Sequence, residues 1–224
     1  MRPLMKYFPI YLDLKDRNIL VVGAGHEAES KVLQLLQTGA QLKLISDTQP
    51  HYLTNFKKYK NFAFEQRKFS AADLQGAWLV ISTLEDRNIN EYIYSTATER
   101  NILCNVVDVT DLCSFIFPAI VTQGDVNIAI STSGKSPALA QNIKEKISDY
   151  IGPEYGFLAE ILGRKRKELI KKIPDKKERS KLFHRLVDSD ALELLRQNRD
   201  YDAEKLISRI IKEEFKDTFI NNAK

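Results

Sequence analysis

The chain has 224 residues, 43% hydrophobic and 29% charged, which is enough for one large domain or for a domain with an appendage. No apolar stretch reaches the roughly 18 residues of a membrane span, and residues 1–9 hold no apolar run typical of a signal peptide, so we expect a cytoplasmic protein without a membrane partner. A net charge of only +4 excludes a broadly basic nucleic-acid-binding protein.

The first fifty residues predict one βαβ unit. The apolar run at residues 19–22 is rich in β-branched side chains, too short for a typical helix, and ends at Gly23 and Gly25. A helical pattern follows, and then a second apolar run at residues 42–45 comes after Gly39, which is typical of a helix end. The expected apolar face of the helix consists of Ala28, Val32, Leu35 and Leu36.

The turn in this unit has the Gly-x-Gly-x-x-Ala pattern of a dinucleotide site. Gly23 permits a tight turn, Gly25 leaves room for a pyrophosphate beside the main chain, and Ala28 allows close packing of helix on strand. The first N–H groups of the helix then face the phosphate charge. A purely structural turn is the alternative, but the complete flanking unit favours the dinucleotide site.

The end of the second strand indicates which dinucleotide binds. Asp47 lies about 20 residues beyond the glycines, where a carboxylate accepts hydrogen bonds from the adenosine ribose. No Arg lies within residues 46–48 to receive a 2′-phosphate, although Lys43 is near. We therefore expect NAD rather than NADP; the alternative is that Asp47 only begins a turn.

Later segments complete a predicted parallel sheet. Residues 78–83 and 102–107 read as buried strands separated by a helix at residues 88–100, with Ile89 and Tyr92 among its apolar positions. Ligands bind at the carboxyl edge of such sheets. Smaller elements are expected at residues 7–14 (an edge segment), 51–59 (a helix), 63–67 (a strand) and 70–73 (a capped helical turn).

The chain changes character after Asp108. Residues 114–121 and 126–130 predict a β-hairpin, followed by a hydroxyl-rich loop at residues 131–137 and a helix at residues 138–150. The remainder is helical and amphipathic. Its polar breaks lie at residues 173–175, 188–190 and 198–200.

The helical tail is locally basic. Residues 163–185 contain eleven Lys or Arg against three Asp or Glu. Such an excess indicates either a solvated helix face or a surface for an acidic ligand. The residues alone leave both open.

Three stretches, taken together, carry a resemblance: residues 21–31, residues 105–108 followed by 114–118, and residues 131–137. In this order and spacing they resemble the precorrin-2 dehydrogenase family, which includes the amino-terminal module of sirohaem synthase. The similarity covers essentially the whole chain. The methyltransferase domain of the fused enzymes is missing, so methylation is not expected.

The resemblance implies an α/β fold: a Rossmann-type parallel sheet at residues 1–113, a small α+β dimerisation segment at 114–151 and an all-helical domain at 152–224. It implies an NAD-dependent enzyme of sirohaem biosynthesis that oxidises precorrin-2 to sirohydrochlorin. Some members also insert ferrous iron. The resemblance also implies a homodimer, in which the segment after the Rossmann domain forms the interface and the helical tail covers the substrate cleft.

Individual positions match the family. Asp108 matches its catalytic aspartate, and a carboxylate at the sheet edge can accept the proton lost when hydride leaves; the alternative is that Asp108 caps the turn. We expect His26 to be a loop residue rather than an acid, because a helix N-terminus disfavours the imidazolium. The cofactor set is Gly23, Gly25, His26, Glu27, Ser46, Asp47, Thr48 and Thr83, and the substrate set is Asn105, Ser131, Thr132, Ser133, Gly134, Lys135 and Ser136.

The hydroxyl-rich loop departs from the family at two positions. Thr132 replaces a serine that is regulatory in some relatives, and Ser133 replaces one of two paired glycines. The first departure puts phosphoregulation in doubt, and the second changes the expected loop shape. Lys135 and the basic tail could receive the carboxylates of the tetrapyrrole.

Two other functions share parts of this pattern. A non-catalytic NAD-sensing module, as attached to ion transporters, needs neither Asp108 nor the loop at residues 131–137. A short-chain dehydrogenase is excluded because Tyr92 and Tyr94 have no Lys four positions on. His51 and His184 suggest no metal-ligand cluster, so we expect no resident metal, and any chelated iron would take its ligands from the tetrapyrrole.

Overall fold

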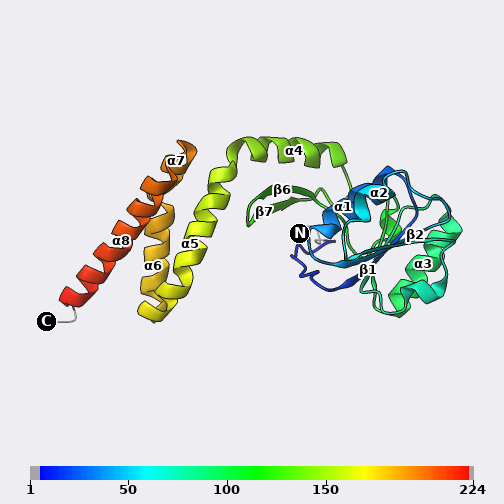
Figure 1. The fold of residues 1–224 in the computed structure, drawn as a ribbon, viewed down its shortest axis with the longest axis horizontal. Coiled ribbons are helices and arrows are strands. Elements are labelled where there is room, and N and C mark those ends of the chain that lie inside the picture. The colour runs from blue at the N-terminus through cyan, green and yellow to red at the C-terminus, as the bar shows by residue number, and fades with distance from the viewer. Residues whose placement is uncertain (1–5, 222–224) are drawn as a thin grey trace, which may run out of the picture. The chain divides into compact units, whose positions relative to one another are not determined.

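A parallel β-sheet organises the first half of the chain (Figure 1). The computed structural model describes residues 6–221, with side chains up to Phe215, and the chain divides after Phe117 into two units. The five strands of the first unit lie in the order β3-β2-β1-β4-β5 and are all parallel. They are β1 Asn18–Val22, β2 Gln41–Ser46, β3 Phe62–Gln66, β4 Leu79–Ser82 and β5 Leu103–Val106.

The register places β1 at the centre of the sheet. Ile19 pairs with Leu42 of β2 on one side and with Leu79 of β4 on the other. The strand order reverses direction at β1, which is the switch point where open α/β sheets bind ligands. The edge segment expected at residues 7–14 forms no strand, and Pro9 has no N–H to donate to a ladder. Its last residue, Leu14, packs against the core of the sheet.

One helix covers each face of the sheet. α1, His26–Leu36, packs on the face of Val21 and Leu44, and its four predicted apolar residues are all buried. α3, Arg87–Glu99, packs on the opposite face over Leu20 and Val80. The face predicted for α3 is partly wrong. Ile89 and Tyr92 are exposed, whereas the inward residues are Asn90, Ile93, Thr96 and Ala97.

The remaining elements of the first unit are short. α2 covers only Leu53–Phe56, less than predicted, and η2 covers Thr110–Leu112. η1, Ala71–Leu74, begins with the predicted capping box, in which the Ser70 N–H donates to Asp73 Oδ2 at 2.8 Å. η1 packs on the same face of the sheet as α3. No full helix connects β3 to β4, and the side chains of Lys43 on β2 and Glu65 on β3 pair with each other.

The second unit starts with the predicted hairpin. β6, Ala119–Gln123, and β7, Val126–Ile130, are antiparallel and joined at Gly124, whose φ is +56°. The first strand begins later than expected, because Pro118 lacks an N–H and Ser114 is bonded to the main chain of β5 instead. α4, Pro137–Tyr150, then follows the hydroxyl-rich loop.

Four helices complete the second unit (Figure 1): α5 Pro153–Lys172, α6 Lys176–Val187, α7 Ala191–Arg196 and α8 Asp200–Asn221. The breaks between them confirm the predicted ones. Their apolar faces meet in a core of their own, in which Leu169, Leu182 and Ile207 are fully buried. Among residues 6–221, no helix combines the length and apolarity of a bilayer crossing.

The hairpin and α5 meet main chain to main chain. A Cβ added to Gly156 would lie 2.6 Å from the carbonyl oxygen of Gln123 and 3.1 Å from the Gly124 nitrogen. No real side chain tolerates such distances. Gly156 is therefore required for this contact.

Candidate functional site: the carboxyl edge of the sheet

Four parallel strands deliver polar residues to one edge of the sheet. The glycine turn follows β1, Ser46 ends β2, Thr83 follows β4 and Asp108 comes shortly after β5. Because the strands are parallel, these ends lie at the same edge. All of them belong to the first unit.

Gly23 lies in direct contact with the end of β4. Its φ is +110°, and its N–H donates to the Ile45 carbonyl at 2.8 Å. A Cβ at this position would lie 2.4 Å from Thr83 Oγ1. Thr83 is held there because its N–H and its hydroxyl both donate to the Val22 carbonyl, at 2.9 and 3.2 Å. The structure therefore brings Thr83 against the glycine turn.

Gly25 has the opposite environment. Its φ is +103°, and nothing lies within 4 Å of an added Cβ. It is the N-cap of α1, where the first main-chain N–H groups have no helical partner. The side chains of His26 and Glu27 are exposed and leave this main chain accessible. An open space beside a helix N-terminus suits a pyrophosphate.

The residues after β2 form a tight turn. Ser46 is buried, and its Oγ accepts a hydrogen bond from the Thr48 N–H at 3.2 Å. The Thr48 hydroxyl lies 3.3 Å from the same oxygen. Asp47, between them, is exposed. Its carboxylate is therefore presented at the edge of the sheet.

Two cations on the neighbouring strands, Lys43 of β2 and Arg67 after β3, are engaged in ion pairs. The Lys43 ammonium lies 2.7 Å from Glu65. The guanidinium of Arg67 binds Glu65 and Asp73, each at 2.5 Å. The main-chain N–H of Arg67 donates to the Ser46 carbonyl. Hydrogen bonds from Arg67 hold the pKa of Asp73 below its usual value, and Lys43 and Arg67 do the same for the pKa of Glu65. These contacts occupy the charge that could otherwise attract a 2′-phosphate.

A buried polar network holds the loop after β4. Ser82 Oγ donates to Asn90 Oδ1 at 2.6 Å, and Asn90 Nδ2 donates to the Leu84 carbonyl at 2.8 Å. The Leu84 N–H donates back to Ser82 Oγ at 3.4 Å. Sequence reasoning missed Ser82 and Asn90. The available signal was an Asn on the inward side of a helix, beside the apolar Ile93 and Ala97.

Asp108 is exposed and has a φ of +62°, a left-handed conformation that Asp tolerates better than most residues. The chain beyond it returns to β5, where Asn105 Nδ2 donates to the Phe115 carbonyl at 2.9 Å and Ser114 Oγ accepts from the Cys104 N–H at 2.8 Å. Asn105 is only 7% exposed. Its amide thus holds the loop that follows Asp108.

The two cysteines are poor nucleophiles. Burial raises the pKa of the Cys104 thiol to about 12 and also raises that of Cys113. The Cys113 thiol donates to the carbonyls of Val106 and Val109, each at 3.2 Å. Among the described residues, no group of three or more His, Cys, Asp or Glu could hold a metal ion.

The predicted substrate loop lies in the second unit. Thr132 Oγ1 accepts from the Ser136 N–H at 3.1 Å and donates to the Ser136 carbonyl at 3.0 Å, and Ser136 Oγ caps α4 through the Leu139 N–H. Ser133, with a φ of +55°, and Lys135 are exposed. The hydroxyls of Thr132 and Ser136 therefore shape the loop, while Ser133 and Lys135 are free to face a ligand.

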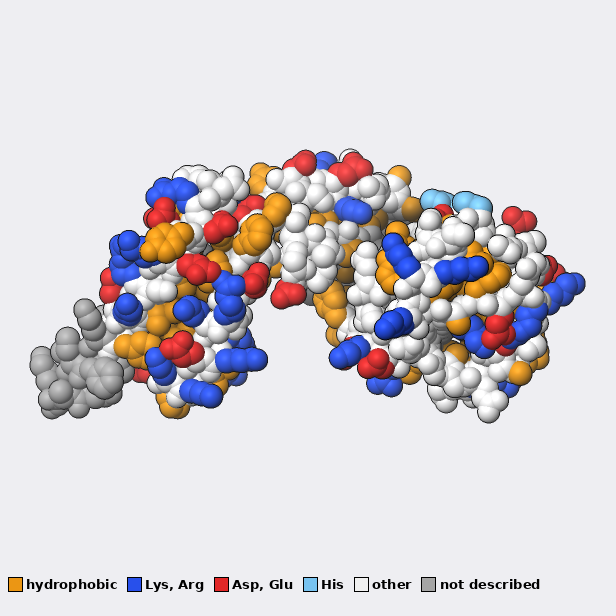
Figure 2. Space-filling model, viewed as in Figure 1, with side chains coloured by type: hydrophobic (Ala, Val, Ile, Leu, Met, Phe, Trp, Pro, Cys, Tyr) orange, Lys and Arg blue, Asp and Glu red, His pale blue; other side chains and the backbone are white. Residues whose placement is uncertain are grey.

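The basic region is partly neutralised. On the face shown in Figure 2, Lys and Arg side chains of the helical part of the second unit lie among Asp and Glu side chains. Arg164 pairs with Glu160 at 2.7 Å, Lys172 pairs with Glu168 at 2.6 Å, and Arg185 pairs with Glu214. These pairs favour the solvated helix face for that part of the positive excess.

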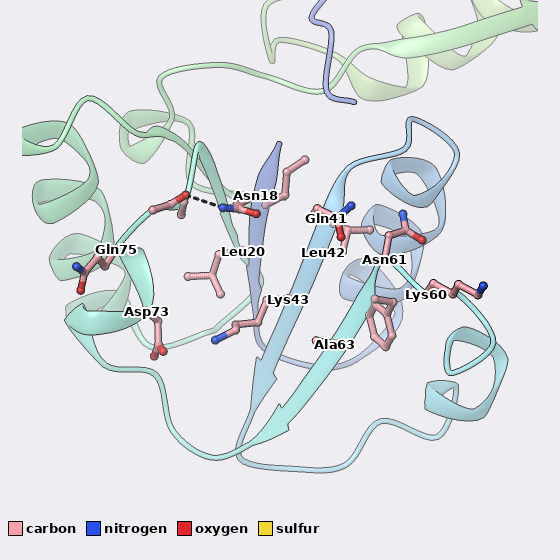
Figure 3. A pocket seen from close by; sticks show the side chains of 14 residues that line it. Asn18, Leu20, Gln41, Leu42, Lys43, Lys60, Asn61, Ala63, Asp73 and Gln75 are labelled. Carbon is pink, nitrogen blue, oxygen red and sulfur yellow. Dashed lines mark hydrogen bonds between the residues drawn. The ribbon is translucent and has the colours of Figure 1, made fainter. Parts of the chain in front are cut away.

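A separate depression lies at the other end of the strands (Figure 3). It has a volume of about 350 Å³ and is lined by the first residues of β1, β2 and β3, where the Asn18 amide donates to the Gly76 carbonyl at 3.2 Å. It lies away from the glycine turn and is therefore not the dinucleotide site.

Comparison with known families follows this division of the chain. Residues 10–119 match a family described as "Putative NAD(P)-binding", residues 123–150 match "Sirohaem biosynthesis protein central", and residues 154–211 match "Sirohaem synthase dimerisation region". The three matches together span most of the chain, which belongs to the family of sirohaem synthase amino-terminal modules. The predicted family, the predicted fold class and a nucleotide-binding domain of the NAD(P) type are thereby confirmed.

Individual relatives support this membership. The chain is 34% identical over 203 residues to a siroheme synthase of Methylococcus capsulatus and 33% identical over 204 residues to one of Actinobacillus pleuropneumoniae. These matches cover 91% of this chain but only 43% and 42% of those proteins. The chain thus spans about two fifths of the length of these relatives.

A solved structure shows the same fold. It is titled "SirC, precorrin-2 dehydrogenase", and it aligns with a TM-score of 0.74 over 91% of this chain and all of that one, at 24% identity. The predicted boundaries at residues 113/114 and 151/152 stay predictions.

Proposed function

We propose that this chain is an NAD-dependent dehydrogenase that oxidises precorrin-2 to sirohydrochlorin in sirohaem biosynthesis. The observation that carries the proposal is the open main chain at Gly25 on the same sheet edge as the exposed carboxylate of Asp108. The family supports the substrate, since one relative is titled a precorrin-2 dehydrogenase.

The residues at this edge fit a dinucleotide. Space at Gly25 and the N–H groups of His26 and Glu27 suit the pyrophosphate, and the contact of Thr83 with Gly23 suits the nicotinamide half. Asp47, flanked by Ser46 and Thr48, would accept hydrogen bonds from the hydroxyls of the adenosine ribose. When bound, NAD supplies the hydride acceptor. The exposed Asp47 and the paired state of Lys43 and Arg67 support NAD over NADP.

Asp108 takes the role of base in this proposal. Loss of hydride from the tetrapyrrole leaves a proton, which a carboxylate at the sheet edge can accept. Hydrogen bonds from Asn105 to the Phe115 carbonyl and from the Cys104 N–H to Ser114 tie residues 114 and 115 to β5. They thereby restrain the loop that carries Asp108. Asn105, proposed as a substrate contact, thus also holds the loop.

The second unit supplies the proposed substrate loop and the proposed dimer contacts. Ser131, Gly134 and the exposed Ser133 and Lys135 offer hydrogen bonds and one positive charge to the substrate carboxylates. A homodimer is supported by the named dimerisation region and by α4, in which only Ala140 is buried while Leu139 is 51% exposed. Iron insertion stays a prediction.

Asp108→Asn tests the reaction. Asn tolerates the same left-handed backbone, so the variant should fold and keep its affinity for NAD+ within about twofold. Removing a general base should lower the rate of sirohydrochlorin formation at least about 100-fold. The measurement is the absorbance change with precorrin-2 and NAD+, together with calorimetric NAD+ binding.

The matched control is Asp111→Asn, an exposed carboxylate of the same loop that pairs with Arg87 at 3.3 Å. It should retain the wild-type rate. A wild-type chain that binds NAD+ but turns over no precorrin-2 would instead favour the NAD-sensing module. Equal rates for wild type and Asp108→Asn would remove Asp108 from the chemistry.

A further inference from the structure

We propose that Asn90 is a positioning residue for dinucleotide binding. From the buried face of α3, its side chain holds residues 83 and 84 against the glycine turn. The inference rests on the proposed function only in taking NAD+ as the ligand. Asn90 itself is 1% exposed and reaches the site only through the main chain of the loop after β4.

The amide of Asn90 joins β4, the loop and α3. Its oxygen accepts from Ser82 Oγ at 2.6 Å, and its NH₂ donates to the Leu84 carbonyl at 2.8 Å. The Leu84 N–H closes the ring by donating to Ser82 Oγ at 3.4 Å. Both ends of the amide are therefore used, and the path of residues 82–84 is fixed from the inside.

α3 gives this network a firm base. Ile93 and Ala97, one and two turns beyond Asn90, are fully buried in the cluster that includes Leu20 and Val80. Asn90 thus projects from a helix that is packed against the central strands. Its position cannot shift without disturbing that core.

The loop that Asn90 holds forms one wall of the glycine turn. An added Cβ on Gly23 would meet Thr83 Oγ1 at 2.4 Å and Leu84 Cδ2 at 3.3 Å, so both loop residues lie directly on Gly23. A displacement of the loop by a fraction of an ångström therefore changes the turn that approaches the pyrophosphate. Affinity for a dinucleotide is sensitive to such displacements because the turn binds through its main chain.

Packing alone does not explain an asparagine here. A leucine at this position would fill similar space on the inward face of α3, and burying an amide is unfavourable unless both of its ends are bonded. The amide offers an acceptor to Ser82 and a donor to the Leu84 carbonyl from two separate atoms. The residue type thus matches the task of holding the loop.

The test uses the full chain with Asn90→Ala, Ser82→Ala and the double variant. Two quantities are measured: the Kd for NAD+ by calorimetry, and amide hydrogen exchange of residues 83–86 without NAD+. Asn90→Ala should raise the Kd about tenfold, the effect of roughly one hydrogen bond. It should also speed exchange in the loop of the free protein.

The double variant should bind NAD+ no more weakly than Asn90→Ala, because residues of one network are not additive. Ser82→Ala, an uncharged change, removes the hydroxyl but leaves the hydrogen bond from Asn90 to the Leu84 carbonyl in place. It should give an intermediate Kd, and it remains informative if Asn90→Ala folds poorly.

The matched control is Thr96→Ala, which removes another buried polar side chain from the inward face of α3. It should change neither the Kd nor the exchange of residues 83–86. An unchanged Kd in Asn90→Ala and Ser82→Ala, or an equal rise in Thr96→Ala, overturns the inference. The inference survives if the wild type binds NAD+ but does not oxidise precorrin-2; a wild type that does not bind NAD+ overturns both proposals.

Discussion

Tyr52 carries a hydroxyl that has no hydrogen-bond partner among the described residues. The side chain is 1% exposed and makes an edge-on contact with Phe56, with ring centroids 5.6 Å apart. Burial, and to a lesser degree the charge of Glu29, raise the pKa of Tyr52 to about 12. The ring stabilises the core, whereas the buried hydroxyl costs free energy.

Tyr52→Phe should therefore raise the free energy of unfolding by about 1 kcal/mol, because the ring is kept and the unsatisfied group is removed. Urea unfolding followed by the fluorescence of Trp78, the single tryptophan, measures this in the first unit. Tyr52→Leu, which loses the ring, should be less stable than wild type. A clear loss of stability in Tyr52→Phe would show that the hydroxyl is bonded in solution.

Some site residues are predictable at this scale and others are not. Gly23 and Gly25 follow from the sequence because positive φ angles favour glycine, and both have them. Gly23 also lies against Thr83, where a Cβ has no room. Asn90 does not follow. The helical spacing of apolar residues predicts Ile89 and Tyr92 on the inward face, but both are exposed. Asn90 is buried instead, because hydrogen bonds with Ser82 and Leu84 offset the cost of burying its amide.

Among the elements, the connection between β3 and β4 is unusual because one short helical turn replaces a full helix. Charged side chains occupy that side of the sheet, where Lys43, Glu65, Arg67 and Asp73 form a chain of ion pairs. Asp73 is the most enclosed of them, with 6% of its side chain exposed. It also accepts the Ser70 N–H, so it joins Arg67 to η1.

Asp73→Asn should lower the free energy of unfolding at pH 7 by about 1 kcal/mol, since a charged hydrogen bond is lost while Arg67 remains partly hydrated. Hydrogen bonding to Arg67 lowers the pKa of Asp73 in the folded state from 3.8. The wild-type advantage is therefore present above pH 3.8 and is lost as the pH falls through the folded pKa.

Urea titrations of both proteins between pH 7 and pH 2 should show this convergence. Glu91→Gln, which breaks an exposed i,i+4 pair with Arg87, is the control and should have little effect at any pH. A constant difference between wild type and Asp73→Asn across the range would contradict the assigned cause.

Elements with internal signals were predicted well. The breaks of the helical region follow from Pro174 and from the Asp and Asn residues at the other two breaks, and the structure has all three. The segment at residues 7–14 has no periodic pattern, so the sequence could not show whether it pairs with the sheet; it forms no strand. The delayed start of β6 depends on Ser114 bonding to β5, ten residues away, which no local pattern encodes.

At the scale of the whole molecule, two units have separate hydrophobic cores. The sheet clusters lie within residues 14–117, and the helical cluster lies within residues 158–215. A change confined to one core should therefore alter the protection of that unit first. Two glycines of α5 allow a matched test.

Gly156→Ala should destabilise the second unit, because the added Cβ would lie 2.6 Å from the Gln123 carbonyl oxygen. Gly163→Ala, in the same helix with nothing within 4 Å, should instead stabilise it by about 0.5–1 kcal/mol through helix propensity. Hydrogen exchange should be faster in β6, β7 and α5 of Gly156→Ala and unchanged in β1–β5. Equal behaviour of the two variants would show that the hairpin contact is not formed.

The glycine turn has a consequence for sequence change. It presents main-chain atoms, while the side chains of His26 and Glu27 extend into solvent, with 90% of the His26 side chain exposed. We therefore expect substitutions to be tolerated at positions 26 and 27, whose side chains are exposed. We expect none to be tolerated at position 23, where a Cβ would meet Thr83. A spectroscopic label attached at position 26 would report on cofactor arrival from the rim of the site while leaving the turn itself intact.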